Sequence, residues 1–208
     1  MIALRVQRLL MQLYGLHHIP NIDQHLIATI PEGATTVVGH RDLQREAVFV
    51  CETGDGLEIG VYLDPAILKR LSRGHAHTRA DDLSCVAEGV SHFIYLTDRY
   101  LEGRTCTPLE LELQAEVDKF LTRALLTLES DGRPPRDLFY RQFEGVSYDA
   151  TLSTDERTRY ETANHFAAKF CHDLADHYLY PFRRGDLIDH VRPFFHEGLQ
   201  EKIARVIP

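Results

Sequence analysis

Two stretches of the sequence place a glutamate four residues before a histidine. Glu88 precedes His92 in CVAEGVSHFIYL, and Glu161 precedes His165 in RYETANHFAAKF. Residues four apart lie on one face of a helix, and a carboxylate with an imidazole suits iron, zinc or manganese. Because helical di-metal proteins supply such ligands from several helices, the repeat raises the hypothesis of a metal site built from these four residues.

The direction in which the four side chains project argues against a buried di-metal centre. Ligands of such a centre must lie on the apolar, inward stripe of each helix. Glu88 with His92, and Glu161 with His165, instead lie roughly opposite the apolar stripes. The stripes consist of Leu83, Val86, Val90, Phe93, Thr97 and Leu101 in the first helix, and of Tyr160, Ala163, Phe166, Ala167, Phe170 and Leu174 in the second. The sequence therefore favours solvated polar faces over a di-metal core.

The helix between these two also has a polar face, with Glu112 and Glu116 opposite its leucines. We expect this face to be solvated too, with an i,i+3 ion pair between Glu116 and Lys119.

The Glu88 face differs from the others because it also contains apolar residues, including Cys85 and Tyr95. A helix that is apolar on two sides is usually covered on both, so Glu88 and His92 would be at least half-buried and would need partners. Those partners could be each other, Arg99, a residue of the predicted hairpin, or a ligand, and Gly89 allows a neighbouring backbone to approach. We therefore predict a ligand-binding pocket at Glu88, His92 and Arg99, with a hydrogen-bonded packing pair as the alternative.

Other polar groups give weaker signals. His75 and His77 lie in a polar loop before two aspartates and could bind zinc, although no third ligand is fixed by spacing. Four arginines flank aromatic clusters and could face an acidic partner, since arginine and tyrosine are enriched at interfaces. These arginines are Arg136, Arg141, Arg183 and Arg184.

Sequence motifs of common enzymes are missing. The chain contains no Gly-x-Ser-x-Gly, P-loop, GxGxxG or HExxH pattern. Its four cysteines are scattered and never form CxxC, which is typical of reduced structural thiols in a cytoplasmic protein.

The overall charge limits the kinds of partner. A net charge of −8 without a run of Lys or Arg disfavours nucleic acid and anionic membrane surfaces. No stretch approaches the roughly 20 apolar residues of a membrane span. The first residues, with Arg5 and Arg8 inside an apolar pattern, predict an amphipathic helix rather than a signal peptide. We expect a cytoplasmic protein.

Turn and capping residues predict the elements. Strands at about 47–52 and 57–63, joined across Gly54-Asp55-Gly56, form a hairpin, and 35–40 could add a third strand. Capping signals at Asp64, Thr107 and Ser153 open helices, and 130–136 breaks the chain. The predicted fold is mainly α (α+β): a single domain over 1–208, with an antiparallel, bundle-like layer of five to six helices over about 64–208 and a small N-terminal sheet within 35–63.

These observations favour a non-enzymatic accessory protein that binds a protein partner or associates with itself. The alternative is a metal- or small-molecule-binding helical protein using Glu88 and His92, with Glu161 and His165 nearby. A third hypothesis is a hydrolase in which these groups act as acid and base.

Overall fold

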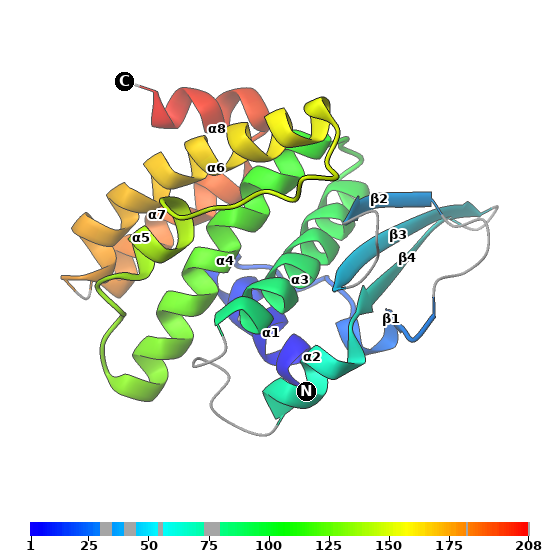
Figure 1. The fold of residues 1–208 in the computed structure, drawn as a ribbon, viewed down its shortest axis with the longest axis horizontal. Coiled ribbons are helices and arrows are strands. Elements are labelled where there is room, and N and C mark those ends of the chain that lie inside the picture. Colours follow the sequence, from blue (N-terminus) through cyan, green and yellow to red (C-terminus); the bar gives the residue numbers. More distant parts are fainter. Residues whose placement is uncertain (30–34, 40–44, 54–55, 73–79, 182, 208) are drawn as a thin grey trace. The chain divides into compact units, whose positions relative to one another are not determined.

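A computed structural model of the chain describes residues 1–29, 35–39, 45–53, 56–72, 80–181 and 183–207. It divides into two compact units, one of Met1–Gln12 with Leu16–Thr105 and one of Leu13–Gly15 with Cys106–Pro208. The mainly helical, α+β class predicted from the sequence is confirmed (Figure 1). The single domain predicted over residues 1–208 stays a prediction.

The first unit combines a mixed sheet with three helices. The strands are β1 (Leu26–Ile27), β2 (Thr35–Gly39), β3 (Glu46–Thr53) and β4 (Gly56–Leu63), in the order β1-β4-β3-β2. The helices are α1 (Ile2–Tyr14, whose last residues belong to the second unit), α2 (Pro65–Ser72) and α3 (Ala80–Leu101). A short 3₁₀ turn, η1 (Ile22–Gln24), precedes the sheet.

The predicted hairpin is confirmed, with β3 and β4 antiparallel from Glu46↔Leu63 to Thr53↔Gly56. Residues 54 and 55 of the predicted turn lie outside the described residues. The third strand is also confirmed, because β2 pairs with β3. The parallel strand β1 was not predicted, since two residues beside β4 give no detectable alternation.

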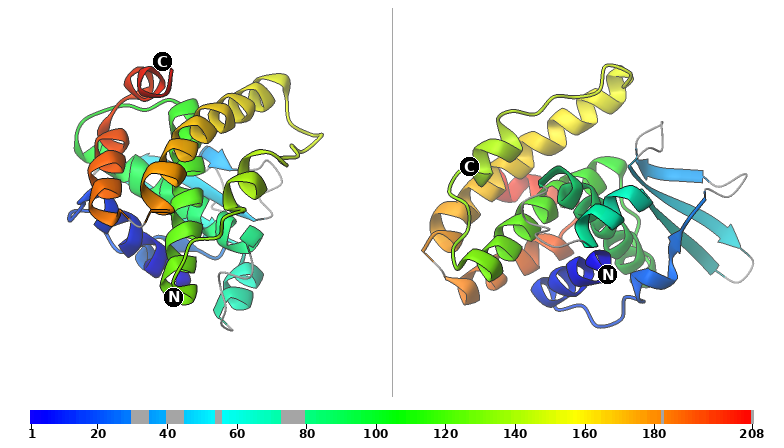
Figure 2. Two further views of the ribbon diagram at one scale, coloured as in Figure 1. Left: turned by 90° about the vertical axis from the view of Figure 1, so that its left-hand side faces the viewer. Right: turned by 60° about the horizontal axis from the view of Figure 1, so that its bottom comes forward.

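Helix α3 packs along β3 and β4, as the views in Figures 1 and 2 show. Gly89 allows this approach, because a Cβ atom there would lie 2.9 Å from Leu63 Cδ2. At the start of the helix Arg70 of α2 donates two hydrogen bonds of 2.7 Å to Asp82. Strands β3 and β4 therefore cover one side of α3, and α2 contacts its first turn.

The second unit is helical: α4 (Pro108–Asp131), α5 (Leu138–Phe143), α6 (Thr154–Leu174), a π-helical turn η3 (Ala175–Leu179), α7 (Arg184–His196) and α8 (Leu199–Val206). The long helices α4 and α6 pack against each other. In Figures 1 and 2 they run in the same general direction, because the chain returns through α5 between them. This pair is therefore parallel rather than antiparallel.

Predicted capping residues begin and end these helices. Thr107 accepts a hydrogen bond from the Glu110 amide, and Ser153 forms a capping box with Glu156. Gly132 ends α4 with φ 73°, a left-handed conformation that glycine adopts without strain. Between α7 and α8 the chain is extended at Glu197 and Gly198, and α8 begins anew there.

Within the described ranges, no helix combines the length and apolar character needed to cross a bilayer.

Candidate functional site

The side of α3 that carries Glu88 and His92 is covered, as the apolar residues on that face predicted. His92 is 1% exposed and Glu88 is half-buried. Glu46, at the start of β3, places its Oε2 atom 4.0 Å from His92 Nδ1. The same carboxylate oxygen lies 3.3 Å from the position of a Cβ on Gly89. A hairpin residue is therefore the neighbour of His92, as one of the sequence alternatives proposed.

Arg99 lies farther along the same side of α3 and has different neighbours. Its guanidinium donates a hydrogen bond to the Tyr95 hydroxyl and lies 4.4 Å from the centre of the Tyr95 ring. A second guanidinium nitrogen is 3.7 Å from Glu102. Arg99 is 1% exposed. The pocket predicted at Glu88, His92 and Arg99 stays a prediction.

Glu161 and His165 lie on the exposed face of α6, in the second unit. Glu161 is 3.9 Å from Arg157, one turn earlier in the helix. The solvated face predicted for this helix is confirmed. Because Glu88 and His92 belong to the first unit, neither unit alone assembles the four residues proposed as metal ligands.

The four residues proposed as metal ligands do not form a cluster of metal-donor atoms among the described residues. Among the described residues, no group of three His, Cys, Asp or Glu donors within 4.8 Å of one another includes Glu88, His92, Glu161 or His165. Binding of iron, zinc or manganese there stays a prediction. His75 and His77 lie outside the described residues.

Cys85, one turn before Glu88, is poorly suited to nucleophilic chemistry. Burial raises the pKa of its thiol, and the nearby carboxylates of Glu46 and Glu88 raise it further. A thiol must ionise to act as a nucleophile. The cluster around Glu46 and His92 therefore resembles a buried polar contact that aligns α3 with the sheet more than a catalytic site.

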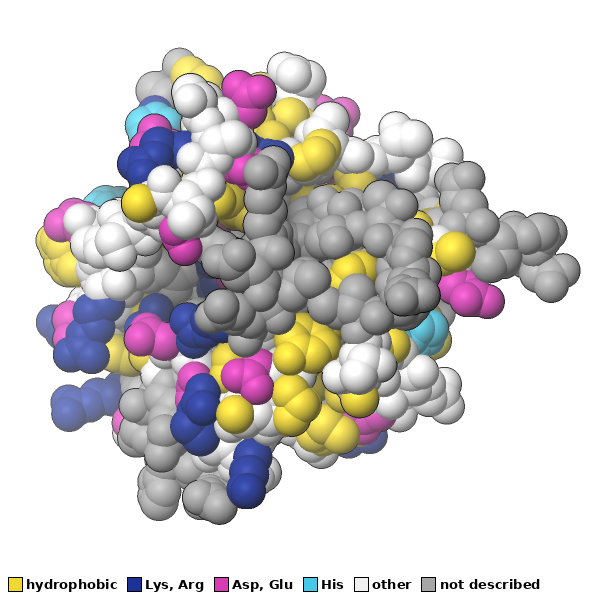
Figure 3. All heavy atoms as spheres, turned by 45° about the vertical axis from the view of Figure 1, so that its right-hand side comes forward, with side chains coloured by type: hydrophobic (Ala, Val, Ile, Leu, Met, Phe, Trp, Pro, Cys, Tyr) yellow, Lys and Arg dark blue, Asp and Glu magenta, His cyan; other side chains and the backbone are white. Residues whose placement is uncertain are grey.

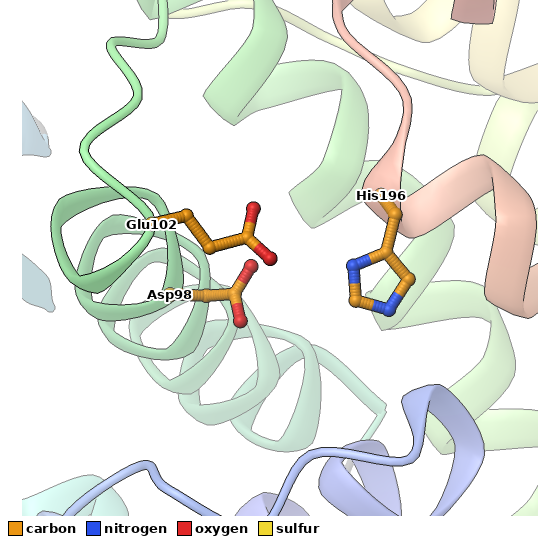
Figure 4. A group of neighbouring side chains, drawn as sticks. All are labelled: Asp98, Glu102 and His196. Carbon is orange, nitrogen blue, oxygen red and sulfur yellow. The ribbon is translucent and has the colours of Figure 1, made fainter.

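The far end of α3 contains two further carboxylates on one side of the helix, Asp98 and Glu102 (Figure 4). Asp98 is fully buried, and His18 Nε2 is 3.1 Å from its Oδ1 atom. Arg104 is 3.3 Å from Glu102, which also faces Arg99. His196, also drawn in Figure 4, belongs to the second unit. Within the first unit, Glu102 thus faces two arginines and the buried Asp98 faces His18, contacts that the sequence did not reveal.

The polar face predicted for α4 is only partly solvated. The Glu116–Lys119 ion pair is confirmed at 2.7 Å. Glu112, however, is 2% exposed and lies 3.9 Å from Arg159 of α6. The expectation of a solvated Glu112 was wrong because α6 covers that side of the helix.

A surface cavity of about 650 Å³ lies where α4 ends. Its walls are the last turn of α4, the Arg133–Arg136 segment and Tyr180 after η3. The lining residues are Thr127, Asp131, Arg133, Pro134, Pro135, Arg136 and Tyr180. All of them belong to the second unit. Gly132 ends the helix and the two prolines restrict the backbone, so the sequence itself shapes this segment.

The cavity is lined by two arginines, Arg133 and Arg136, whose charges are not neutralised by described residues of the chain. Neither guanidinium forms an ion pair or a hydrogen bond with a residue in the described ranges, and both side chains are exposed. The nearby Arg141 differs, because it lies 2.6 Å from Asp137. Asp131, the acidic residue of the lining, accepts a 2.7 Å hydrogen bond from Ser130. The cavity therefore contains two arginine guanidiniums that pair with no described residue, beside an aspartate carboxylate that already accepts a hydrogen bond.

Tyr180 fixes the opposite wall of the cavity. Its hydroxyl donates a 3.0 Å hydrogen bond to the backbone carbonyl of Arg136. Burial raises the pKa of Tyr180, and Asp176 and Asp137 raise it further, so the phenol remains a neutral donor at physiological pH. The bond holds the arginine segment against η3.

Of the arginines predicted to form an interaction surface, Arg136 lines the cavity and Arg141 lies on the adjoining helix α5. Arg183 is 3.5 Å from Asp186 and does not line it, and neither does Arg184. The sequence did not identify Arg133 or Tyr180, whose proximity depends on how α6 and η3 pack.

Charges elsewhere on the surface are mixed. On the face drawn in Figure 3, basic and acidic side chains are interspersed rather than gathered into an area of one sign. The net charge of the whole chain is −8, so a cavity lined by two arginines that pair with no described residue differs in charge from the chain as a whole.

No protein-family model matches the chain, and comparisons with curated proteins and with solved structures find no match.

Proposed function

We propose that this protein is an accessory protein that binds an acidic segment of a protein partner in the cavity between α4 and Tyr180. The observation that supports the proposal is the pair of guanidiniums, Arg133 and Arg136, that face this cavity without an ion pair to any residue in the described part of the chain. An arginine side chain presents five N–H donors in a planar fork and binds carboxylates in a bidentate manner.

The apolar part of the cavity supports a peptide rather than a simple ion. Pro134 and Pro135 contribute apolar surface beside the arginines, and Tyr180 adds an aromatic ring. On the adjoining helix α5, Tyr140 is 61% exposed. Tyrosine and arginine are the residues that most often dominate the binding energy of protein interfaces. A segment with carboxylates next to an apolar residue would complement these groups.

Binding of defined peptides tests the proposal. The probe is a fluorescein-labelled twelve-residue peptide of alternating acidic and apolar residues, and its counterpart has lysine at every acidic position. We expect fluorescence anisotropy to show binding of the acidic peptide only. The affinity should fall as salt is raised from about 50 to 500 mM, because exposed charges are screened over a shorter distance.

Charge reversal identifies the surface. The double variant R133E/R136E should weaken binding at least tenfold. The matched control R5E/R8E changes the same number of charges at two exposed positions of α1, and it should bind like the unmodified protein. Equal losses in both variants, or binding of the lysine peptide with similar affinity, would contradict the proposal.

Self-association through this cavity is the rival outcome. Sedimentation velocity of the unmodified protein and of R133E/R136E separates self-association from binding of an acidic partner. A dimer that dissociates in R133E/R136E would show that a second copy of the chain, and not an acidic partner, occupies the cavity.

A further inference from the structure

Helix α5 carries an exposed aromatic ring next to the arginine cavity. Tyr140 lies in the first turn of this helix, in the second unit, and its side chain is 61% exposed. Tyrosine and arginine are both enriched at protein interfaces. The position of Tyr140 relative to the cavity therefore bears on which partner the cavity binds.

Neighbouring rings on the same helix hold Tyr140 in place. The Phe139 ring meets the Tyr140 ring edge to face, with centres 5.9 Å apart and planes at 86°. Phe139 in turn packs on Phe143, with centres 5.3 Å apart, and Phe143 is buried. A ring that is already fixed loses little conformational entropy when a partner binds. Tyr140 is therefore suited to anchor a partner.

Tyr180 is a common neighbour of Tyr140 and Arg136. Its hydroxyl donates a 3.0 Å hydrogen bond to the Arg136 carbonyl, and its side chain lines the cavity. Burial raises the pKa of Tyr180, and the carboxylates of Asp176 and Asp137 raise it further. The Tyr140 phenol also raises this pKa, whereas the Arg136 guanidinium lowers it. Tyr140 thus lies close enough to Tyr180 to interact with it electrostatically, and its exposed ring continues the surface of the cavity.

The charges near Tyr180 favour an uncharged residue of the partner beside Tyr140. The negative charges of Asp137 and Asp176 reach this place, so a further carboxylate there would be repelled. Asp137 already pairs with Arg141 at 2.6 Å, so a basic residue would gain little. The acidic residues of a bound segment therefore fit the arginines of the cavity, and an uncharged residue fits the Tyr140 side.

We propose that the acidic segment carries an aromatic residue whose ring packs on Tyr140, while neighbouring carboxylates of the segment pair with Arg133 and Arg136. This inference rests on the acidic-segment binding proposed above, and it names the apolar residue that such a partner contains. Aromatic rings attract one another edge to face or offset. The Arg136 guanidinium, which pairs with no described residue, can also stack on a ring. An aliphatic side chain offers neither interaction.

The experiment compares three acidic twelve-residue peptides by fluorescence anisotropy. Their apolar positions are all alanine except a central one, which is phenylalanine, cyclohexylalanine or alanine. The cyclohexylalanine peptide separates aromatic character from apolar size. We expect the phenylalanine peptide to bind about tenfold more tightly than the alanine peptide and about threefold more tightly than the cyclohexylalanine peptide, because an aromatic pair gains more than its buried area.

Variants of Tyr140 test where the ring binds. Tyr140→Ala should reduce the preference for phenylalanine over alanine to within about twofold, whereas Tyr140→Phe keeps the ring and should retain the preference. Tyr100→Ala is the matched control, because Tyr100 is an exposed tyrosine of the first unit, and it should retain the preference too. Far-UV circular dichroism verifies that each variant is folded.

Two results would overturn this inference while the binding of acidic segments by the arginines still stood. One is equal affinity for the three peptides, with binding still lost in R133E/R136E. The other is a preference for phenylalanine that persists in Tyr140→Ala. If none of the three peptides bound, the acidic-segment proposal itself would be refuted, and this inference with it.

Discussion

At the scale of single residues, the second unit contains a buried polar cluster that no sequence pattern revealed. The Tyr14 hydroxyl donates to Asp118, and Gln114 Nε2 lies 3.0 Å from the same carboxylate. Lys202 donates 2.6 Å hydrogen bonds to Gln114 and to the Phe194 carbonyl. Buried polar groups cost free energy unless they are bonded, and this network provides those bonds.

Ionisation of Tyr14 is expected to lower the free energy of unfolding at alkaline pH. Burial raises the pKa of Tyr14 well above 10.0, and Asp118 raises it further. A raised pKa in the folded state means that stability is complete below pH 10 and falls as pH rises further. Burial of Cys171 likewise raises its pKa above 9.0, so the decline should begin near pH 9.

We predict that Tyr14→Phe lowers the free energy of unfolding by about 1–3 kcal/mol at pH 7, because Asp118 loses a donor. It should also reduce the decline in stability above pH 10. Urea unfolding at intervals from pH 7 to 11 measures both effects. A variant whose stability fell as steeply as that of the unmodified protein would show that Tyr14 is not the titrating group.

Gly89 tests the contact between α3 and the sheet. We predict that Gly89→Ala destabilises the protein by about 1 kcal/mol, because overpacking a buried contact costs about 1–3 kcal/mol and outweighs the helix propensity gained, about 1 kcal/mol. The new Cβ would lie 2.9 Å from Leu63 Cδ2, in the buried interior.

The control is Gly185→Ala in the first turn of α7, where a Cβ would meet nothing within 4 Å. Urea unfolding should show this variant unchanged or slightly more stable. If both alanine variants were stabilised alike, the close approach at Gly89 would be refuted.

At the scale of elements, local signals were sufficient to locate most helix ends. Pro65, Pro108 and Ser153 stand where capping rules place them, and the side chain of Asp64 accepts a 2.8 Å hydrogen bond from the Ala66 amide. These bonds form within a few residues and so can be predicted from sequence. The covering of α3 could not be predicted in detail, because Glu46 is distant in sequence from His92.

The capping box of α6 gives a prediction at this scale. Ser153→Ala should lower the free energy of unfolding by about 1 kcal/mol, the usual cost of losing an N-cap hydrogen bond. In the structure the Ser153 side chain accepts from the Glu156 amide, and the Glu156 carboxylate accepts from the Ser153 amide. Thermal and urea unfolding provide the measurement.

Ser130→Ala is the matched control, since Ser130 is exposed in the last turn of α4, where the hydroxyl caps no helix N-terminus. Its effect should stay within about 0.5 kcal/mol, as for most surface substitutions. A loss at Ser130 equal to that at Ser153 would show that the box adds nothing specific.

At the scale of the whole molecule, the α+β class followed from the hairpin signal and from long amphipathic segments. The candidate sites were harder to foresee. Arg136 was identified from its aromatic neighbours, whereas Arg133 and Tyr180 meet only because η3 follows α6. Sequence spacing predicts neighbours on one helix but not across two.

The proposed accessory function makes the cavity at Arg133 and Arg136 the main interaction surface. In this account, the partner contributes the carboxylates that the residues described in the structure do not provide for these two arginines. Tyr140, exposed on the neighbouring helix α5, is a suitable position from which to capture that partner.

The most direct test is photo-cross-linking in the native host, with a photoreactive phenylalanine analogue in place of Tyr140 and mass spectrometry of the cross-linked peptides. We expect a cross-link to an acidic segment of one partner protein, and we expect R133E/R136E to abolish it while R5E/R8E leaves it unchanged. Cross-links that persist in R133E/R136E, or that join segments without acidic residues, would contradict the account.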